Sequence, residues 1–168
     1  MNTKQKQQQL VSSGFTLIEI LMVMGIIALL AAIVIVAINP ARQFAQARNS
    51  QRVSNVNAIL NAVGQNVADH RGVFECAAGD IPTTATVMKS GAGGGGAGSG
   101  YNIAPCLVPL YLPSLPFDPS ALGAHNTSET DYDTGYTIAR DTATNRITVA
   151  APHANTAPEL SQEISATR

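Results

Sequence analysis

An uncharged apolar run near the N-terminus constrains this chain more than any other feature. No Asp, Glu, Lys or Arg occurs from Ile20 to Ile38, and roughly 20 apolar residues are enough for a helix to cross a bilayer. Glu19 stands at the start of the run, where a charge costs less than the about 2.5–3.5 kcal/mol of a position at the membrane centre. The segment must be buried in lipid or in other chains, and Glu19 either finds a partner there or stays at the interface.

The residues that precede the run are arranged unlike an ordinary secretory signal. Residues 1–13 are polar and rich in Gln, with Lys4 and Lys6 as their only charged side chains. In a secretory signal the small residue at the cleavage site follows the apolar region. Here the small residue, Gly14, comes before it. Cleavage after Gly14 would leave the apolar helix at the new N-terminus of the mature protein.

The string Gly-Phe-Thr-Leu-Ile-Glu at positions 14–19, followed by the apolar run, closely resembles the prepilin signal of type IV pilins and type II secretion pseudopilins. The resemblance is strong from residue 14 to about residue 73 and weaker beyond. It implies that a prepilin peptidase cuts between Gly14 and Phe15 and then N-methylates Phe15. It also implies that Glu19 meets the N-terminal amine of a neighbouring subunit during assembly. The plain alternative for Gly14, a glycine where the chain enters a helix, does not explain the whole string.

Pro40 divides the expected N-terminal helix. Proline lacks a backbone N–H and clashes with the preceding turn, and the residue before it, Asn39, is biased away from helical geometry. We expect a helix that is continuous in the isolated subunit and loosens over residues 32–39 in a filament. The chain then comprises a leader (1–14), a transmembrane or filament-core helix (15–39), an amphipathic helix (40–72) and a globular head (73–168).

Beyond Pro40 the apolar residues follow first a helical and then a strand-like period. A stripe at three- and four-residue steps predicts an amphipathic helix that packs on the protein's own sheet and ends near Gly72. The stripe consists of Val53, Val56, Leu60, Val63 and Val67. Segments 136–139 and 146–150, joined by residues 141–145, predict a β-hairpin. We expect segment 73–115 to be loop-like apart from a third strand near residues 101–108, and the tail from Pro152 to follow the surface.

The predicted fold class is therefore α+β, with a long N-terminal helix packed on a small antiparallel sheet, as in type IV pilins. Cys76 and Cys106 flank a glycine-rich tract, residues 91–100. In an exported chain two cysteines predict one disulfide, with two free thiols as the alternative. The tract lacks the Lys-Ser/Thr that follows a phosphate-binding loop, so nucleotide binding is not expected.

Few residues suggest reaction chemistry. Three histidines, at positions 70, 125 and 153, have no ligand spacing and are expected at the surface. Glu129, Asp131 and Asp133 form an acidic cluster that is either a weak calcium site or a solvated loop. The resemblance does not extend to the calcium loop of major pseudopilins residue for residue. We expect no other metal, no cofactor and no enzymatic activity.

The function that these features predict is that of a structural subunit, a major pilin of a surface filament. The alternative is a pseudopilin that acts as a periplasmic piston in type II secretion. A membrane-anchored enzyme or binding domain is a third hypothesis, but it lacks a catalytic constellation. The expected partners are identical subunits, prepilin peptidase, an assembly platform and, before assembly, the membrane; the formal net charge of -1 gives no sign of a specific nucleic acid. We expect a single-pass inner-membrane precursor and an extracellular filament.

Overall fold

The computed structural model describes residues 14–91, 100–155 and 162–168. Residues 1–13 of the expected leader and residues 92–99 of the glycine-rich tract lie outside the described residues. The chain forms two compact units, Met1–Pro40 and Ala41–Arg168. The amphipathic helix thus belongs to the same unit as the head.

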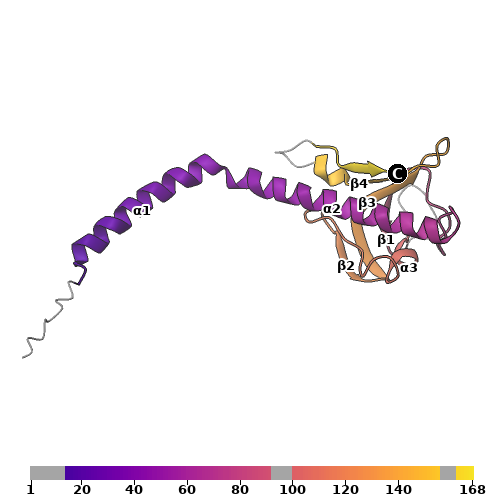
Figure 1. Ribbon diagram of the computed structural model, residues 1–168, viewed down its shortest axis with the longest axis horizontal. Coiled ribbons are helices and arrows are strands. Elements are labelled where there is room, and N and C mark those ends of the chain that lie inside the picture. The colour runs from indigo at the N-terminus through magenta and orange to yellow at the C-terminus, as the bar shows by residue number, and fades with distance from the viewer. Residues whose placement is uncertain (1–13, 92–99, 156–161) are drawn as a thin grey trace, which may run out of the picture. The chain divides into compact units, whose positions relative to one another are not determined.

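Helix α1 spans Leu17–Ile38 (Figure 1). Apart from Glu19 its side chains are all apolar, chiefly Leu, Ile, Val, Ala and Met. Segment Leu17–Val36 is long and apolar enough to cross a membrane, and none of it is buried within the chain. The expected apolar helix is therefore present, with its whole surface available to lipid or to other chains.

Helix α2 spans Pro40–Asp69. Val56, Leu60 and Val63 of the expected stripe are buried, whereas Val53 at its N-terminal end is 44% exposed. The helix ends as the sequence indicates, near Gly72, whose N–H donates to the carbonyl of Val67 at 2.8 Å. This six-to-one bond is typical of a Schellman ending.

Five antiparallel strands form one sheet in the order β1-β3-β4-β5, with β2 also paired to β3. The strands are β1 Thr86–Lys89, β2 His125–Ser128, β3 Asp131–Arg140, β4 Ile147–Ala150 and β5 Ser165–Thr167. Strand β3 is central and carries the longest run of buried residues. The short helices α3 (Ala104–Leu107) and η1 (Pro152–Asn155) complete the unit.

The predicted hairpin is present as β3 and β4, with Arg140 opposite Ile147. The third strand was predicted in the wrong place. It is β1, within the segment that we expected to be loop-like, while Tyr101 makes only an isolated bridge to Met88 and residues 104–107 are helical. The tail does not simply follow the surface, because β5 pairs with β4 and extends the sheet.

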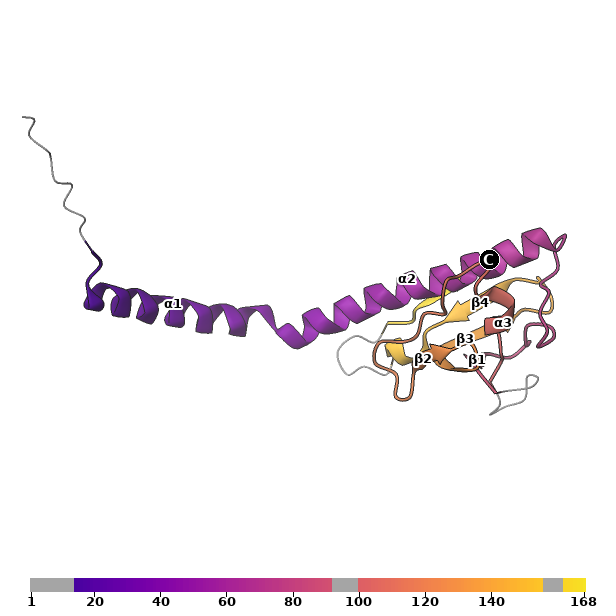
Figure 2. The same cartoon turned by 90° about the horizontal axis from the view of Figure 1, so that it is seen from below.

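The core of the second unit lies between α2 and the sheet, which run side by side in Figures 1 and 2. Ile59 and Val63 of α2 belong to one buried cluster with Tyr136 and Ile138 of β3 and Val149 of β4. All five are at most 1% exposed. The predicted packing of the amphipathic helix on the protein's own sheet is thus confirmed.

The outer side of α2 carries no charge over most of its length. Arg52 is the only charged residue between positions 49 and 68, and it is buried. The exposed positions of this stretch are small, amide or aliphatic residues: Ser50, Gln51, Val53, Ser54, Asn57, Asn61, Gln65 and Ala68.

Candidate functional site

The start of α1 is built around Thr16 and Glu19. Thr16 is the N-cap, with φ -82° and ψ 151°, and its hydroxyl accepts a hydrogen bond from the backbone N–H of Glu19 at 3.3 Å. A Thr followed three residues later by Glu is the pattern of a capping box. Sequence reasoning treated Glu19 only as a charge in an apolar run, although this second signal was present in the same residues.

The peptide that joins Gly14 to Phe15 lies ahead of the helix and is open to solvent. Both residues are exposed and non-helical, and Phe15 is 79% exposed. A β-carbon added at Gly14 would meet no atom within 4 Å. The packing of the chain itself therefore does not require glycine at this position, so any requirement must come from a partner that handles the peptide.

Glu19 is the one ionisable side chain in the apolar segment Leu17–Val36, and it is exposed in the first helical turn. A carboxylate is favourable there because the first turn carries the positive end of the helix dipole. Glu19 thus places one negative charge in the first turn of α1, and the rest of the segment presents an uncharged apolar surface.

The two helices are separated by a single residue. Asn39 has φ 46° and ψ 79°, a left-handed conformation, and Pro40 is the first residue of α2. Our expectation of a continuous helix in the isolated subunit is therefore wrong. Proline is well suited to a first helical position, and Asn tolerates left-handed geometry better than most residues.

Cys76 and Cys106 form the predicted disulfide, with their Cα atoms 5.1 Å apart. The buried side chain of Asn66 lies between the two cysteine segments. Its amide donates to the carbonyls of Glu75 at 3.1 Å and Cys106 at 3.3 Å, and its oxygen accepts from the N–H of Glu75 at 3.0 Å. A single residue of α2 thus holds both arms of the bridged loop.

The acidic residues proposed as calcium ligands do not converge. Asp131 and Asp133 are in β3 rather than in a loop, and Asp133 accepts the N–H of Gly135 at 2.9 Å. Asp131 lies 3.2 Å from His125. Among the described residues no group of three or more His, Cys, Asp or Glu side chains could hold a metal ion. Glu129 lines a separate cleft, described below.

The histidines are likewise scattered. His70 lies 3.4 Å from Glu75, and His153 is in η1. The pKa of His125 is raised by the carbonyl of Gly123 and, next, by the carboxylate of Asp131. His125 is exposed and His70 and His153 are half-buried, so none of them forms a catalytic or metal-binding group with the others.

Sequence reasoning missed a buried ion pair in the head. Arg52 of α2 donates from Nε to Asp118 Oδ2 at 2.7 Å and from Nη2 to Oδ1 at 3.0 Å. Further bonds from its guanidinium reach Asn49 at 2.7 Å and Ser120 at 2.6 Å. The side chains of Arg52 and Asp118 are 1% and 0% exposed. A lone arginine in an amphipathic pattern gives no signal that distinguishes such a pair from a solvated charge.

The backbone around Asp118 also helps to hold its carboxylate in place. Its carboxylate also accepts the N–H groups of Ser120 and Ala121, each at 2.9 Å. Gly135 of β3 has φ +68°, and a β-carbon there would come within 3.1 Å of the β-carbon of Asp118. Burial alone raises the pKa of Asp118, but the hydrogen bonds from Arg52 and the backbone, together with the charge of Arg52, lower the pKa below its ordinary value.

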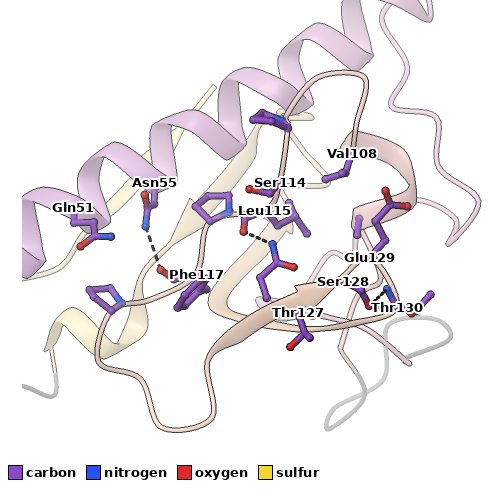
Figure 3. A pocket seen from close by; sticks show the side chains of 15 residues that line it. Gln51, Asn55, Val108, Ser114, Leu115, Phe117, Thr127, Ser128, Glu129 and Thr130 are labelled. Atoms are coloured by element: carbon purple, nitrogen blue, oxygen red, sulfur yellow. Dashed lines mark hydrogen bonds between the residues drawn. The ribbon is translucent and has the colours of Figure 1, made fainter.

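Beside this ion pair lies a cleft of about 830 Å³ (Figure 3). Its walls are α2, the proline-rich segment 113–119, Ala104 and Val108 at the two ends of α3, and the segment 126–130, which includes the end of β2 and the following turn. Gln51 and Asn55 contribute from the helix and Phe117 from the proline-rich wall.

The head thus has an ordered interior and a cleft of about 830 Å³, and α1 has an exposed apolar surface with a polar start. No protein-family model, curated protein sequence or solved structure gives a significant match to this chain.

Proposed function

We propose that this protein is the structural subunit of an extracellular type IV pilus-like filament, made as a single-pass inner-membrane precursor. The observation that carries the proposal is α1: an apolar helix with no side chain buried in its own chain, preceded by an exposed Gly14–Phe15 peptide. Such a helix needs lipid around it before assembly and other copies around it afterwards. The proposed fold of the head and α2 is type IV pilin-like.

Glu19 has a defined role in this proposal. Cleavage after Gly14 creates a positive amine on Phe15, close to the helix start, where the dipole makes a cation unfavourable. In the apolar interior of a filament, the carboxylate of Glu19 from a neighbouring copy compensates that amine. Opposite charges attract more strongly there than in water, and neither ion stays unpaired. The pair then fixes the axial register between copies.

The test of the proposal is the chemical identity of the mature N-terminus. Intact-mass and peptide analysis of the membrane and sheared-surface fractions should find a chain that starts at Phe15 with one added methyl. Gly14→Glu should leave the precursor uncut. A β-carbon at this position meets no atom within 4 Å beyond its chain neighbours, so we expect a block to reflect the peptidase and not misfolding. Gly25→Ala, at a glycine with equally open surroundings, is the matched control and should be processed normally.

Two outcomes would contradict the proposal: a mature chain that still carries residues 1–14, or a processed chain that never appears in sheared filaments by electron microscopy. Processed subunits found only in short assemblies that depend on an outer-membrane secretin would instead support the alternative, a type II secretion pseudopilin.

A further inference from the structure

The cleft beside segment 113–119 has the size of a small-molecule site. Its volume of about 830 Å³ lies within the roughly 300–1,000 Å³ of ligand pockets in proteins. Its lining comes from separate parts of the head: α2, the ends of α3, the proline-rich segment and the segment 126–130 (Figure 3). Nothing in the proposed filament role assigns an occupant to it.

The walls are held in place without a ligand. Asn55 donates to the carbonyl of Phe117 at 3.2 Å and to the hydroxyl of Tyr136 at 2.9 Å. Across the cleft, Asn126 donates to the carbonyl of Leu115 at 2.7 Å. Because these bonds already order the proline-rich wall, a ligand need not order it on binding, and less affinity is lost.

The charge of the lining excludes several ligand classes. Among the described residues, no Lys, Arg or His lines the cleft, and Glu129 is its one charged side chain. Phosphates, sulfates and nucleic acids are recognised mainly by cationic side chains. The remaining polar lining consists of amides and hydroxyls, including Gln51, Ser114 and Thr130. Such groups both donate and accept hydrogen bonds, as do the hydroxyls of a neutral ligand.

Phe117 adds an apolar platform to this polar lining. Phe117 is 43% exposed and lines the cleft together with Pro116 and Pro119. An exposed aromatic ring in a cleft offers a flat face for the C–H surface of a ligand, while the groups around it bind the polar edge. The lining thus suits a molecule with alternating apolar faces and hydroxyl edges.

An extended peptide fits less well. A peptide would gain most by adding a strand to the outer edge of β2. That edge already faces segment 113–119, to which the Asn126 side chain is bonded. A strand that displaced this segment from beside β2 would first have to break this bond.

We propose that this cleft binds a short, uncharged oligosaccharide. One sugar ring lies on Phe117, and hydroxyls along the oligosaccharide bond to Gln51 at one end of the cleft and to Glu129 at the other. The site is in the head and does not depend on cleavage or on assembly. It gives the subunit a ligand-binding activity in addition to its structural role.

Ligand-observed saturation-transfer NMR on the full chain in lipid nanodiscs tests the proposal. Detergents with sugar head groups are left out because they would compete for the cleft. The probes are lactose, maltotriose and triacetylchitotriose, with a heparin disaccharide as the anionic probe and a Pro/Ser-rich peptide as the extended one. At least one uncharged sugar should bind, and Phe117→Ala should weaken it by about tenfold or more. Gln51→Ala and Glu129→Gln should each weaken it too.

Gln65→Ala is the matched control, since Gln65 is exposed on α2 but outside the cleft; it should bind as the unaltered chain does. Circular dichroism checks that each variant is folded. If Phe117→Ala fails to fold, the exposed Gln51 and Glu129 variants decide the question. The proposal is overturned if no uncharged sugar binds, if binding survives the cleft variants, or if the heparin disaccharide or the peptide binds more tightly.

Discussion

Arg52 and Asp118, 66 positions apart, form a two-pronged ion pair from which solvent is almost completely excluded. The pair ties α2 to the segment that leads from the proline-rich wall into the sheet. All three guanidinium nitrogens of Arg52 donate hydrogen bonds. A fully bonded buried pair of this kind specifies one arrangement of the loop, and it is costly to break from one side.

Arg52→Ala should therefore lower the free energy of unfolding of the head by about 3–5 kcal/mol, because it leaves Asp118 buried without its cation. Urea denaturation followed by circular dichroism measures the change. Asp80→Asn is the matched control: its pair with Arg140 is longer, at 3.6 Å, and Asp80 is 77% exposed, so the loss should be about 0–1 kcal/mol. Equal losses in the two variants would show that the buried pair has no special role.

The same pair predicts how stability depends on pH. The folded-state pKa of Asp118 lies below its ordinary value, so in acid the unfolded chain takes up the proton first. The ionised Asp118 contributes fully to the free energy of unfolding when the pH is above the ordinary pKa of an aspartate. This contribution is lost as the pH falls through the folded-state pKa of Asp118. Denaturation midpoints measured from neutral pH into this acid range should therefore fall. Asp118→Asn should have lower stability at neutral pH and a shallower acid decline; an unchanged decline would contradict the assignment.

The Cys76–Cys106 disulfide closes a loop across a sequence separation of 30. By the loop-entropy model it stabilises the head by about 3–4 kcal/mol. Reduction, or replacement of both cysteines by serine, should lower the denaturation midpoint accordingly. Asn66→Ala tests the side chain that bonds both arms of the bridged loop. It should destabilise even the oxidised protein, because the N–H and C=O of Glu75 lose their hydrogen bonds to the Asn66 side chain. A double serine variant as stable as the unaltered chain would refute the prediction.

Glu19 can act through its charge or through the helix start, and two substitutions separate these roles. Glu19→Gln keeps a side chain that suits the third position of a capping box but removes the charge. We expect this variant to be cleaved, to remain in the membrane and to form few filaments, with the thermal stability of the head unchanged. Thr16→Ser, which retains the capping hydroxyl, should assemble normally. Normal filament yield from Glu19→Gln would show that the charge is not needed.

The interruption at Asn39 should depend on Pro40. In Pro40→Ala the missing N–H is restored and the ring clash is removed, so the helix should become continuous across this position. Backbone chemical shifts of residues 36–42 in nanodiscs would report the change. Asn39→Gly should keep the interruption, because glycine adopts left-handed geometry readily. A left-handed residue 39 that persists in Pro40→Ala would mean that proline is not the cause.

The elements predicted correctly are those with a repeated pattern. The apolar run of α1, the stripe of α2 and the alternation of the β3–β4 hairpin each extend over several residues, so a few exceptions such as Val53 do not obscure them. Strand β1 has only Thr86–Lys89 and was missed because four residues give too little alternation. Residues 104–107 were assigned to a strand, although Pro105 is well placed in the first turn of a helix.

The features that sequence reasoning missed depend on distant partners. The burial of Arg52 requires Asp118 and the close approach allowed by Gly135, and neither follows from local periodicity. The Asn39–Pro40 pair did indicate a departure from helical geometry, but a bias at one residue does not say whether the break is already present in the isolated chain. The cleft forms only when four separate segments meet, so no local motif indicates it.

The scarcity of charge on the outer side of α2 has a consequence for how salt affects contacts made through it. Because Arg52 is paired inside the head, residues 49–68 contribute no exposed charge of their own, although the exposed Arg168 brings one to this side by donating to Asn61 at 2.8 Å. A contact made away from Arg168, through exposed positions such as Ser50 and Ser54, would therefore involve no side-chain ion pair for salt to screen. Salt that weakens charge-driven contacts would have little effect on a contact of that kind.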